Sequence, residues 1–421
     1  GASQDNDPGV NAGHGMVIIS YGNAYTHYYN DPDELAIDVV FSEAVTVTGT
    51  PQLTLDFSSD ETLDYGSGST TIALVFPYTV EDGQNSDDLD YSSTSALALN
   101  GGTIKDAAGN VATLTLVTPG DPTSLGANQN LVIDTTHPTL HQTAGSKVYS
   151  AKDPGSYTVD EVIDILVGFS EKVEYAGTPT LTLNFATDKA VAVTGGGGTE
   201  ALTFRYTVEA GQNSTDLDYT ATNSLAGGTY IRDLAGNAAT LTLPSPGASG
   251  SLGHNEALVI DTDAPALDTG NGGVVDATSD DKVYIDDTVD IWVLFDEVVY
   301  VTGTPTLTLE IGDTDAVVNY STGSGEADKK LHFIYTVAEG HTSSDLDYAA
   351  TSSLALNSGT IKDLAGNDAV LTLSAPGAAN AGSLAANAAV VVDGVRPEVT
   401  SVTSTTNNGS YNHVDDGGGD N

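Results

Sequence analysis

Residues 41–55 have the sequence FSEAVTVTGTPQLTL, and this stretch decides the fold class because it occurs three times. It returns as FSEKVEYAGTPTLTL at 169–183 and as FDEVVYVTGTPTLTL at 295–309. Apolar residues alternate with polar ones on both sides of a Gly-Thr-Pro turn signal, which is the period-2 pattern of half-buried strands. The copies begin 128 and 126 residues apart. This is the size of a whole domain rather than of a solenoid repeat.

Other motifs recur in the same order around this stretch. They are Asp-Leu-Asp-Tyr, beginning at Asp88, Asp216 and Asp345; Asp-x-Ala-Gly-Asn, beginning at Asp106, Asp233 and Asp363; and a closing segment that ends at Pro138, Pro265 and Pro397. Thr and Val are abundant, as suits pleated strands, and no segment has a helical stripe. We therefore predict an all-β chain of tandem immunoglobulin-like β-sandwich domains, with about seven strands each, in an elongated array.

The motifs also set the expected boundaries. They predict an N-terminal linker remnant at 1–13, three repeats at 14–136, 137–263 and 264–394, and the first strand of an incomplete fourth repeat at 395–421. Asp5-Asn6-Asp7-Pro8 resembles the end of a preceding linker. The chain is therefore interpreted as part of a longer array.

Composition restricts the possible partners. The 421 residues include 58 acidic residues against 12 Lys and Arg, for a formal net charge of −46. Such a charge repels nucleic-acid phosphates, and it opposes folding unless salt or bound cations screen it. The chain has no cysteine, which excludes disulfides and thiolate metal sites. No apolar run approaches the ~18 residues of a membrane helix, so we expect no direct membrane insertion.

The acidic residues fall at the ends of the predicted domains. In an immunoglobulin-like strand order, Phe-x-Glu ends the second strand, and its Glu lies in the following loop. The Asp-x-Ala-Gly-Asn turn lies at the same end, where the linker arrives. Asp134 should therefore approach Glu171, Asp233 and Asn237. Asp261 and Asp263 should likewise approach Glu297, Asp363 and Asn367. Further members of the pattern are Glu43, Asp106 and Asn110 in the first repeat and Asp393 in the last linker.

Crowded carboxylates of this kind predict a bound cation. Ca²⁺ takes 6–8 oxygen ligands in flexible geometry, whereas Mg²⁺ demands a stricter octahedron, so calcium is the predicted ion. The alternative is that these Asp and Asn side chains only shape turns by bonding the backbone. The Asp-Leu-Asp-Tyr loops stay open between a cation site and backbone bonding. Their tyrosines resemble the tyrosine corner of β-sandwiches.

These motifs together resemble bacterial Ig-like, cadherin-like repeats. The matching runs are Phe-Ser-Glu-Ala-Val, Gly-Thr-Pro-x-Leu-Thr-Leu, Asp-Leu-Ala-Gly-Asn and Val-Ile-Asp-Thr-Thr-x-Pro. Such repeats fill giant secreted adhesins and swimming-motility surface proteins. The resemblance covers nearly the whole chain. It implies an extracellular, cell-surface location and calcium at the domain junctions, held by the residues named above. Asp296 in place of Ser, and Gly394-Val395 in the last linker, depart from the pattern.

Catalytic motifs are not apparent. The eight histidines do not recur at equivalent positions, and no Ser-His-Asp arrangement stands out. Three near-identical units would also carry three unspecialised active sites. Trp292, the single tryptophan, is expected in the core of a strand. We therefore predict a non-enzymatic protein.

Three functions are compatible with the sequence. The first is a structural spacer in a surface adhesin or fibre, stiffened by calcium. The second is a filament or surface-layer subunit, whose tail 399–414 adds a strand to another copy. The third is a ligand-binding module, which is favoured least because the loop 184–199 differs from its counterparts only in length and glycine content. The expected partners are thus neighbouring repeats and other copies of the chain.

Overall fold

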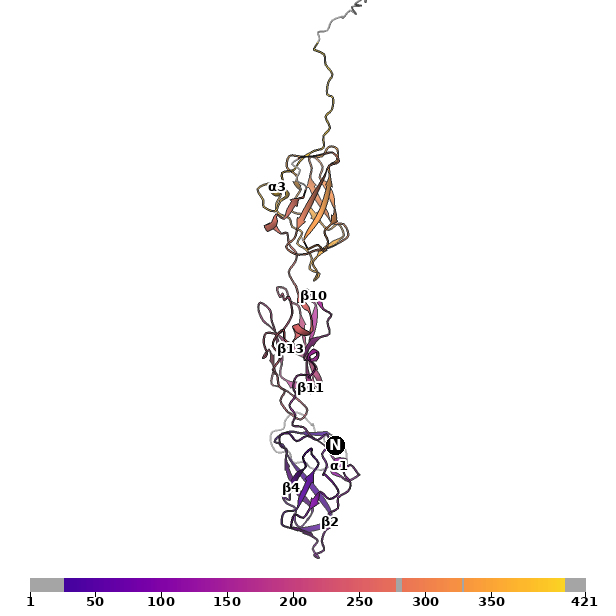
Figure 1. Cartoon of the computed structure of the whole chain (residues 1–421), viewed down its shortest axis with the longest axis vertical. Helices are drawn as coiled ribbons and strands as arrows, with labels where there is room; N and C mark the ends of the chain where they lie inside the picture. The colour runs from indigo at the N-terminus through magenta and orange to yellow at the C-terminus, as the bar shows by residue number, and fades with distance from the viewer. Residues whose placement is uncertain (1–25, 278–281, 328, 406–421) are drawn as a thin grey trace, which may run out of the picture. The chain divides into compact units, whose positions relative to one another are not determined.

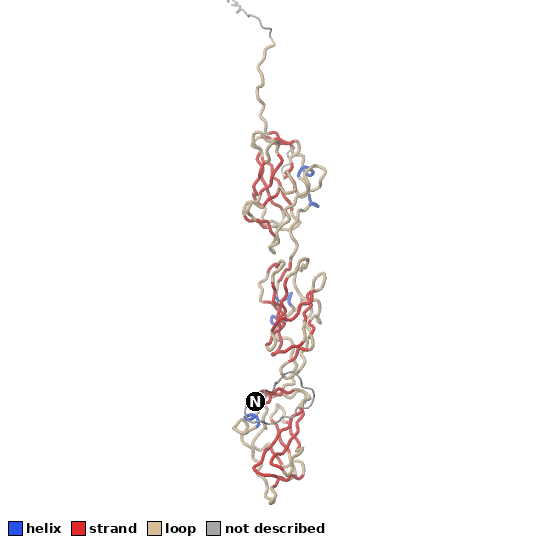
Figure 2. Tube along the Cα trace, turned by 180° about the vertical axis from the view of Figure 1, so that it is seen from behind, coloured by secondary structure: helices blue, strands red, loops and turns tan. Residues whose placement is uncertain are grey.

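Strands dominate the chain. The computed structural model describes residues 26–277, 282–327 and 329–405, and within them the helices are single turns (Figures 1 and 2). Each sequence repeat encloses its own cluster of buried apolar side chains. The first two repeats lie in one compact unit, residues 1–262, and the third lies in another, residues 263–421. The prediction of tandem all-β sandwich domains is confirmed. None of the described helices has the length and apolar character needed to cross a membrane.

The first repeat contains β1 (Thr26–Tyr29), β2 (Glu34–Thr48), β3 (Gln52–Leu55), β4 (Glu61–Asp64), β5 (Thr71–Thr79), β6 (Leu97–Ala98), β7 (Thr103–Lys105), α1 (Leu125–Asn128) and β8 (Asn130–Ile133). The second contains the 3-10 turn η1 (Ala144–Ser146), β9 (Val148–Ser150), β10 (Gly155–Tyr157), β11 (Val162–Ala176), β12 (Thr180–Leu183), β13 (Lys189–Gly195), β14 (Thr199–Thr207), β15 (Leu225–Ala226), β16 (Tyr230–Arg232), α2 (Leu252–Asn255) and β17 (Leu258–Ile260).

The third repeat contains the 3-10 turn η2 (Thr269–Asn271), β18 (Val274–Asp276), β19 (Lys282–Tyr284), β20 (Thr288–Leu294), β21 (Tyr300–Thr302), β22 (Thr306–Glu310), β23 (Ala316–Thr322), β24 (Lys330–Thr336), β25 (Thr342–Ser343), β26 (Asp347–Tyr348), β27 (Leu354–Ala355), β28 (Thr360–Lys362), α3 (Leu384–Asn387) and β29 (Val391–Asp393). The repeats contain more strands than the predicted seven, and many of the additional strands have only two or three residues. Such short strands leave no periodic signal in the sequence.

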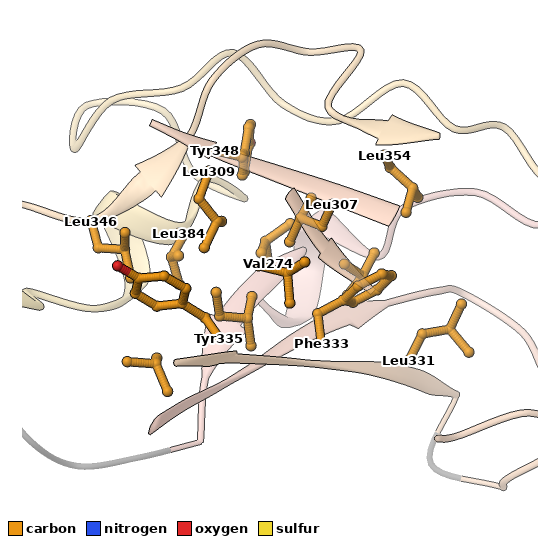
Figure 3. Packing of buried hydrophobic residues seen from close by; sticks show 14 of the residues in the cluster. Val274, Leu307, Leu309, Leu331, Phe333, Tyr335, Leu346, Tyr348, Leu354 and Leu384 are labelled. Atoms are coloured by element: carbon orange, nitrogen blue, oxygen red, sulfur yellow. The ribbon is translucent and has the colours of Figure 1, made fainter. Parts of the chain in front are cut away.

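One long strand of the second repeat pairs with different partners along its length. The N-terminal half of β11 pairs antiparallel with β14, and its last three residues pair with β16. Ile163, Ile165 and Val167 alternate along it and are fully buried. The third repeat builds the same kind of core, in which Leu307 and Leu309 of β22 face Phe333 and other side chains of β24 (Figure 3).

In each repeat an early strand runs side by side with the last strand. β1 pairs in parallel with β8, β10 with β17, and β19 with β29. The chain therefore leaves each repeat next to the turn that follows β1, β10 or β19. The acidic linker residues Asp134, Asp261 and Asp393 stand at or directly after the end of these closing strands.

Two predictions about local structure are wrong. The second strand does not end at Phe-Ser-Glu in the first two repeats; β2 and β11 run on through it, with a shift of register between Val40 and Val45 and between Gly168 and Val173.

Trp292 is not a core residue. Its sequence neighbours point into the core, while its own ring lies partly exposed on the outer face, with Lys330 Nζ 3.6 Å from the ring centroid.

Candidate metal centre

The linker residue Asp134 is held by the strand that precedes it. Its backbone N–H donates to the Tyr29 carbonyl over 2.9 Å, which continues the β1–β8 pairing by one residue. Its Oδ1 accepts the N–H of Thr136 over 2.9 Å, which closes a side-chain turn. The position of this carboxylate is therefore fixed by backbone bonds of the first repeat.

Glu171 reaches the same place from the shifted segment of β11. A register shift adds residues on one strand, bends it and re-aims the side chains there. Glu171 lies between the paired residues Gly168 and Val173, and its side chain is partly buried. The irregularity in the strand, rather than a loop, is thus what presents this carboxylate at the domain end.

Asp233 is fixed by the Asp-x-Ala-Gly-Asn turn. Its Oδ1 accepts the N–H groups of Gly236 and Asn237 over 2.7 and 2.9 Å, and its Oδ2 accepts Asn237 Nδ2 over 2.8 Å. Gly236 has φ of +105°, in the region that favours glycine, so the tight turn depends on this residue. Asp233 is only 2% exposed.

The three carboxylates converge. Asp134, Glu171 and Asp233 each offer one oxygen, and these oxygens all lie within 4.8 Å of one another. Two oxygens on opposite sides of a Ca²⁺ ion, at ~2.4 Å each, would be about 4.8 Å apart, so the three fit around one such ion. The donor set is oxygen only, which suits a hard cation and not zinc or copper. The residues therefore form a candidate metal centre within the first compact unit.

Electrostatics point the same way. Burial raises the pKa of Glu171 from 4.5 to about 7, and the charges of Asp134 and Asp233 add to the effect. Burial also raises the pKa of Asp233, although three hydrogen bonds oppose it. The ionised cluster is thus unfavourable by itself, and a cation placed between the oxygens would remove that penalty.

Asn237 has a role that its sequence pattern did not indicate. Its Nδ2 donates to the backbone carbonyl of Asp134 over 2.7 Å as well as to Asp233. The side chain therefore ties the linker backbone directly to the turn of the second repeat, beside the carboxylates. Its role as a ligand stays a prediction, and its amide nitrogen positions the linker.

The linker after Asp134 also forms hydrogen bonds with the second repeat, which sequence reasoning missed. His137 Nδ1 donates to the Ala238 carbonyl over 2.9 Å, and Thr240 N donates to the Pro138 carbonyl over 2.8 Å. Thr139 N donates to Ser170 Oγ, and Ser170 N donates back to the Thr139 carbonyl. The sequence feature that could have indicated these contacts is the position of Thr139 directly after the recurring proline.

The second compact unit repeats half of this geometry. Asp363 Oδ1 accepts the N–H groups of Gly366 and Asn367 over 2.6 and 2.8 Å, and its Oδ2 accepts Asn367 Nδ2. One carboxylate oxygen of Glu297, which lies between β20 and β21, is within 4.8 Å of one from Asp363. Asp263 is the first residue of this unit. Asp261 belongs to the other unit, where its N–H donates to Tyr157.

The remaining predicted ligands do not form a cluster of three acids among the described residues. Asp106 accepts Asn110 N and Nδ2 over 2.7 and 2.6 Å, and these bonds hold the pKa of its carboxyl below the usual value. Glu43 and Asn110 are exposed. The linker residues Asp5 and Asp7 lie outside the described residues. Asp393 ends β29 and is partly buried.

The second Asp of each Asp-Leu-Asp-Tyr loop bonds the backbone. Asp218 Oδ1 accepts Tyr219 N, and its Oδ2 accepts Gly247 N, both over 2.9 Å. The Tyr219 hydroxyl donates to the Pro244 carbonyl over 2.7 Å. The same three bonds recur in the other repeats. The carboxylate of Asp218, and those of its equivalents, thus hold the loop that contains Gly247, or its counterpart, against the domain.

Comparisons with known proteins give no further guide. No protein-family model matches the chain, and no curated protein matches it significantly. The carboxylate cluster and the linker contacts are therefore the features that bear on function.

Proposed function

We propose that this chain is a non-enzymatic, extracellular structural repeat region of a bacterial surface adhesin or fibre, with Ca²⁺ bound at its domain junctions. The observation that carries the proposal is the convergence of Asp134, Glu171 and Asp233 within 4.8 Å. One ligand comes from the linker and two come from the following repeat. A cation at this point would bind two successive domains together, which is a mechanical role rather than a catalytic one.

The linker geometry supports a junction that can transmit force between the two repeats. Thr135 is tied to the first repeat, where its N–H donates to Asn85 Oδ1 over 2.8 Å. His137 is tied to the second repeat through Ala238. Only Thr136 lies between these two attachments. Such a short linker transmits force from one repeat to the next. A cation beside it would strengthen the contact between the two repeats.

The second junction is proposed on sequence equivalence. Asp261 holds the position of Asp134, and Glu297 and Asp363 hold those of Glu171 and Asp233. Asp263 is a further carboxylate in that linker. We expect a second Ca²⁺ there, with Asn367 in the positioning role of Asn237.

The test is calorimetry with and without calcium. Because Ca²⁺ binds the folded state, it should raise the Tm by mass action, and a chelator should reverse the rise. Asp134→Asn should reduce the calcium-dependent rise, because it removes a ligand charge. The matched control is Asp188→Asn, an exposed residue of the same repeat, which should leave the rise intact. A Tm that is insensitive to calcium, with no binding heat, would rule the cation site out.

A second candidate function is a polymer subunit that associates through its C-terminal segment. The observation in its favour is the exposure of Val399 and Val402, which are 83% and 92% exposed in an extended segment after the third repeat. Deleting residues 398–421 should abolish assembly under this proposal and leave a simple spacer unchanged.

A further inference from the structure

The loop that follows β5, β14 and β24 is closed by glutamine in the first two repeats and by histidine in the third. Gln84, Gln212 and His341 each lie six residues after a buried tyrosine. The hydroxyls of Tyr78 and Tyr206 donate to the glutamine Oε1 over 2.7 Å. The backbone N–H three residues before each glutamine donates to the same oxygen. One side-chain acceptor therefore holds this loop in the first two repeats.

His341 supplies the acceptor with a ring nitrogen. Its Nδ1 accepts the Tyr335 hydroxyl over 2.8 Å and the Ala338 N–H over 3.2 Å, and the two rings stack with centroids 5.8 Å apart. Because a backbone N–H can only donate, Nδ1 carries no proton, and the neutral imidazole has its proton on Nε2. Burial raises the pKa of Tyr335 to about 12, so this hydroxyl stays protonated. The imidazole can be protonated near neutral pH, whereas an amide oxygen cannot.

Two carboxylates beside the glutamines are replaced by alanines in the third repeat. Gln84 Nε2 donates to Glu61 over 3.1 Å, and Gln212 Nε2 lies 3.4 Å from Glu209 Oε2. The equivalent positions in the third repeat are Ala316 and Ala338. The acids that would pair with a protonated imidazole in the first two repeats are therefore replaced in the one repeat that has the histidine.

The charged residues in the segments around this loop are mostly exposed, so water and salt screen them. They are Glu339 in the loop, Asp286 and Asp287 in the turn paired with Val337, Asp313 and Asp315 after β22, Lys282 of β19, and the partly buried Asp393 of β29. Their net charge is negative and attracts a protonated ring. It does not change the orientation of the Ala338 N–H toward Nδ1.

The same loop holds the chain where it leaves the third repeat. The Gly394 N–H donates to the His341 carbonyl over 2.8 Å, and the Gly340 N–H donates to the Gly394 carbonyl over 2.9 Å. Gly394 is buried, and a Cβ there would lie 2.4 Å from a carbonyl oxygen of the loop. In the first two repeats the corresponding link is made by the side chains of Thr135 and Thr262. The exit of the third repeat thus depends on the backbone of the loop that the imidazole holds.

We infer that the third repeat contains a pH-sensitive loop, in which protonation of His341 releases residues 338–341 and loosens the outgoing chain at Gly394. A proton on Nδ1 would face the Ala338 N–H, donor against donor, and that N–H would lose its acceptor. The unfolded chain takes up the proton without this loss, so the third repeat becomes less stable as the pH falls. The inference does not involve the carboxylate cluster and is independent of the proposed calcium site.

The size of the effect follows from proton linkage. A histidine in an unfolded chain titrates near pH ~6.5, and below this pH the ratio of folded to unfolded protein falls by up to about 10-fold per pH unit. PH 5 is about 1.5 units lower, which sets an upper limit of about 30-fold. The loss of one hydrogen bond corresponds to about 5-fold. We therefore expect the ratio for the third repeat to fall by about 5- to 30-fold between pH 7.5 and pH 5.

The test is guanidinium unfolding of the full chain in chelator at pH 7.5 and pH 5, followed by the fluorescence of Trp292. The chain has a single tryptophan, so this signal reports the third repeat. The reference is His341→Gln, which installs the side chain of the first two repeats. The unchanged protein should show the 5- to 30-fold fall relative to this variant. His332→Gln is the matched control and should retain the fall, because the His332 ring contacts Asp290, which favours its protonated form.

Ala338→Glu tests the inference without changing the histidine. Ala338 is exposed, and a glutamate there restores the carboxylate that Glu209 places beside Gln212. It should stabilise the protonated ring and reduce the fall at pH 5 at least 2-fold. This variant also decides the question if His341→Gln does not fold, because an undiminished fall in Ala338→Glu would then contradict the inference.

Hydrogen exchange measures the effect on the outgoing chain. At pH 5 the segment 391–396 should exchange at least 5-fold faster in the unchanged protein than in His341→Gln, and at pH 7.5 the two should agree. Equal pH dependence of the two proteins in unfolding overturns the inference. Equal exchange of this segment at pH 5 overturns the link between the loop and the exit of the repeat.

Discussion

Replacing Glu171 by Gln should stabilise the protein without calcium and weaken it with calcium. The folded-state pKa of Glu171 is raised from 4.5 to about 7 by burial and by two neighbouring carboxylates. Because the shift is upward, the ionised form destabilises the fold. The penalty is absent below pH 4.5, grows as the pH rises toward 7 and is complete above it.

The magnitude follows from the size of that shift. A tenfold change in proton affinity corresponds to about 1.4 kcal/mol, so a shift from 4.5 to about 7 gives a full penalty of at most about 3.5 kcal/mol. Water reaches this partly exposed carboxylate and screens it, which leaves about 1–2 kcal/mol. Glu171→Gln in chelator at pH 8 should therefore raise the free energy of unfolding by about 1–2 kcal/mol, and at pH 4 it should change little.

Calcium should reverse the sign. At 100 times its Kd, a ligand that binds only the folded state adds about 2.7 kcal/mol. Glu171→Gln removes a charged ligand, so it should forfeit much of this gain and become the less stable form. The assay is guanidinium unfolding of both forms at pH 4 and pH 8, with calcium and with chelator. Glu200→Gln, an exposed residue of the same repeat, is the matched control. The reasoning is refuted if Glu171→Gln changes the free energy of unfolding in the same direction with calcium and with chelator. It is also refuted if the substitution has no effect in chelator at pH 8.

Three further substitutions test individual parts of the fold, each by guanidinium unfolding in chelator. Asn237→Ala removes the bond to the Asp134 carbonyl and should cost about 2 kcal/mol, whereas Asn110→Ala, at the exposed equivalent whose bonds among the described residues are to Asp106, should cost less. Tyr219→Phe removes one hydroxyl bond to a backbone carbonyl and should cost about 1 kcal/mol. Phe204→Ala empties a fully buried site and should cost about 3–5 kcal/mol. A neutral result at any of these positions would contradict the assigned contact.

Much of the architecture could be predicted because its causes are local. Alternation in Leu181-Thr182-Leu183 indicates a strand with one buried face, and that is how β12 lies. Gly109, Gly236 and Gly366 were expected in tight turns, and all three have positive φ. These features depend on neighbours in the sequence, where a single chain carries the signal.

The errors concern features that depend on distant residues. The continuation of β11 through Ser170 and Glu171 depends on its pairing with β16, more than fifty residues away. The strand at Trp292 was identified, but its outward face was not, because a residue of this size is most often buried and only the register assigns its side. Likewise, the bond from Asn237 to the Asp134 carbonyl spans 103 residues. No local pattern encodes such contacts.

The Phe-x-Glu stretch explains why strand docking and cation binding should be coupled. Phe169 and Ser170 receive the incoming linker, and Glu171, the next residue, presents its carboxylate to Asp134 of that linker. The register shift in β11 places all three at one edge. A linker that docks therefore brings its own carboxylate to the cluster, and a cation bound there should hold the linker strand in register. Without the cation, ionised Glu171 and Asp134 oppose the same docking that the backbone bonds favour. If calcium binds as proposed, the balance between these two effects would make this junction the most calcium-sensitive part of the chain.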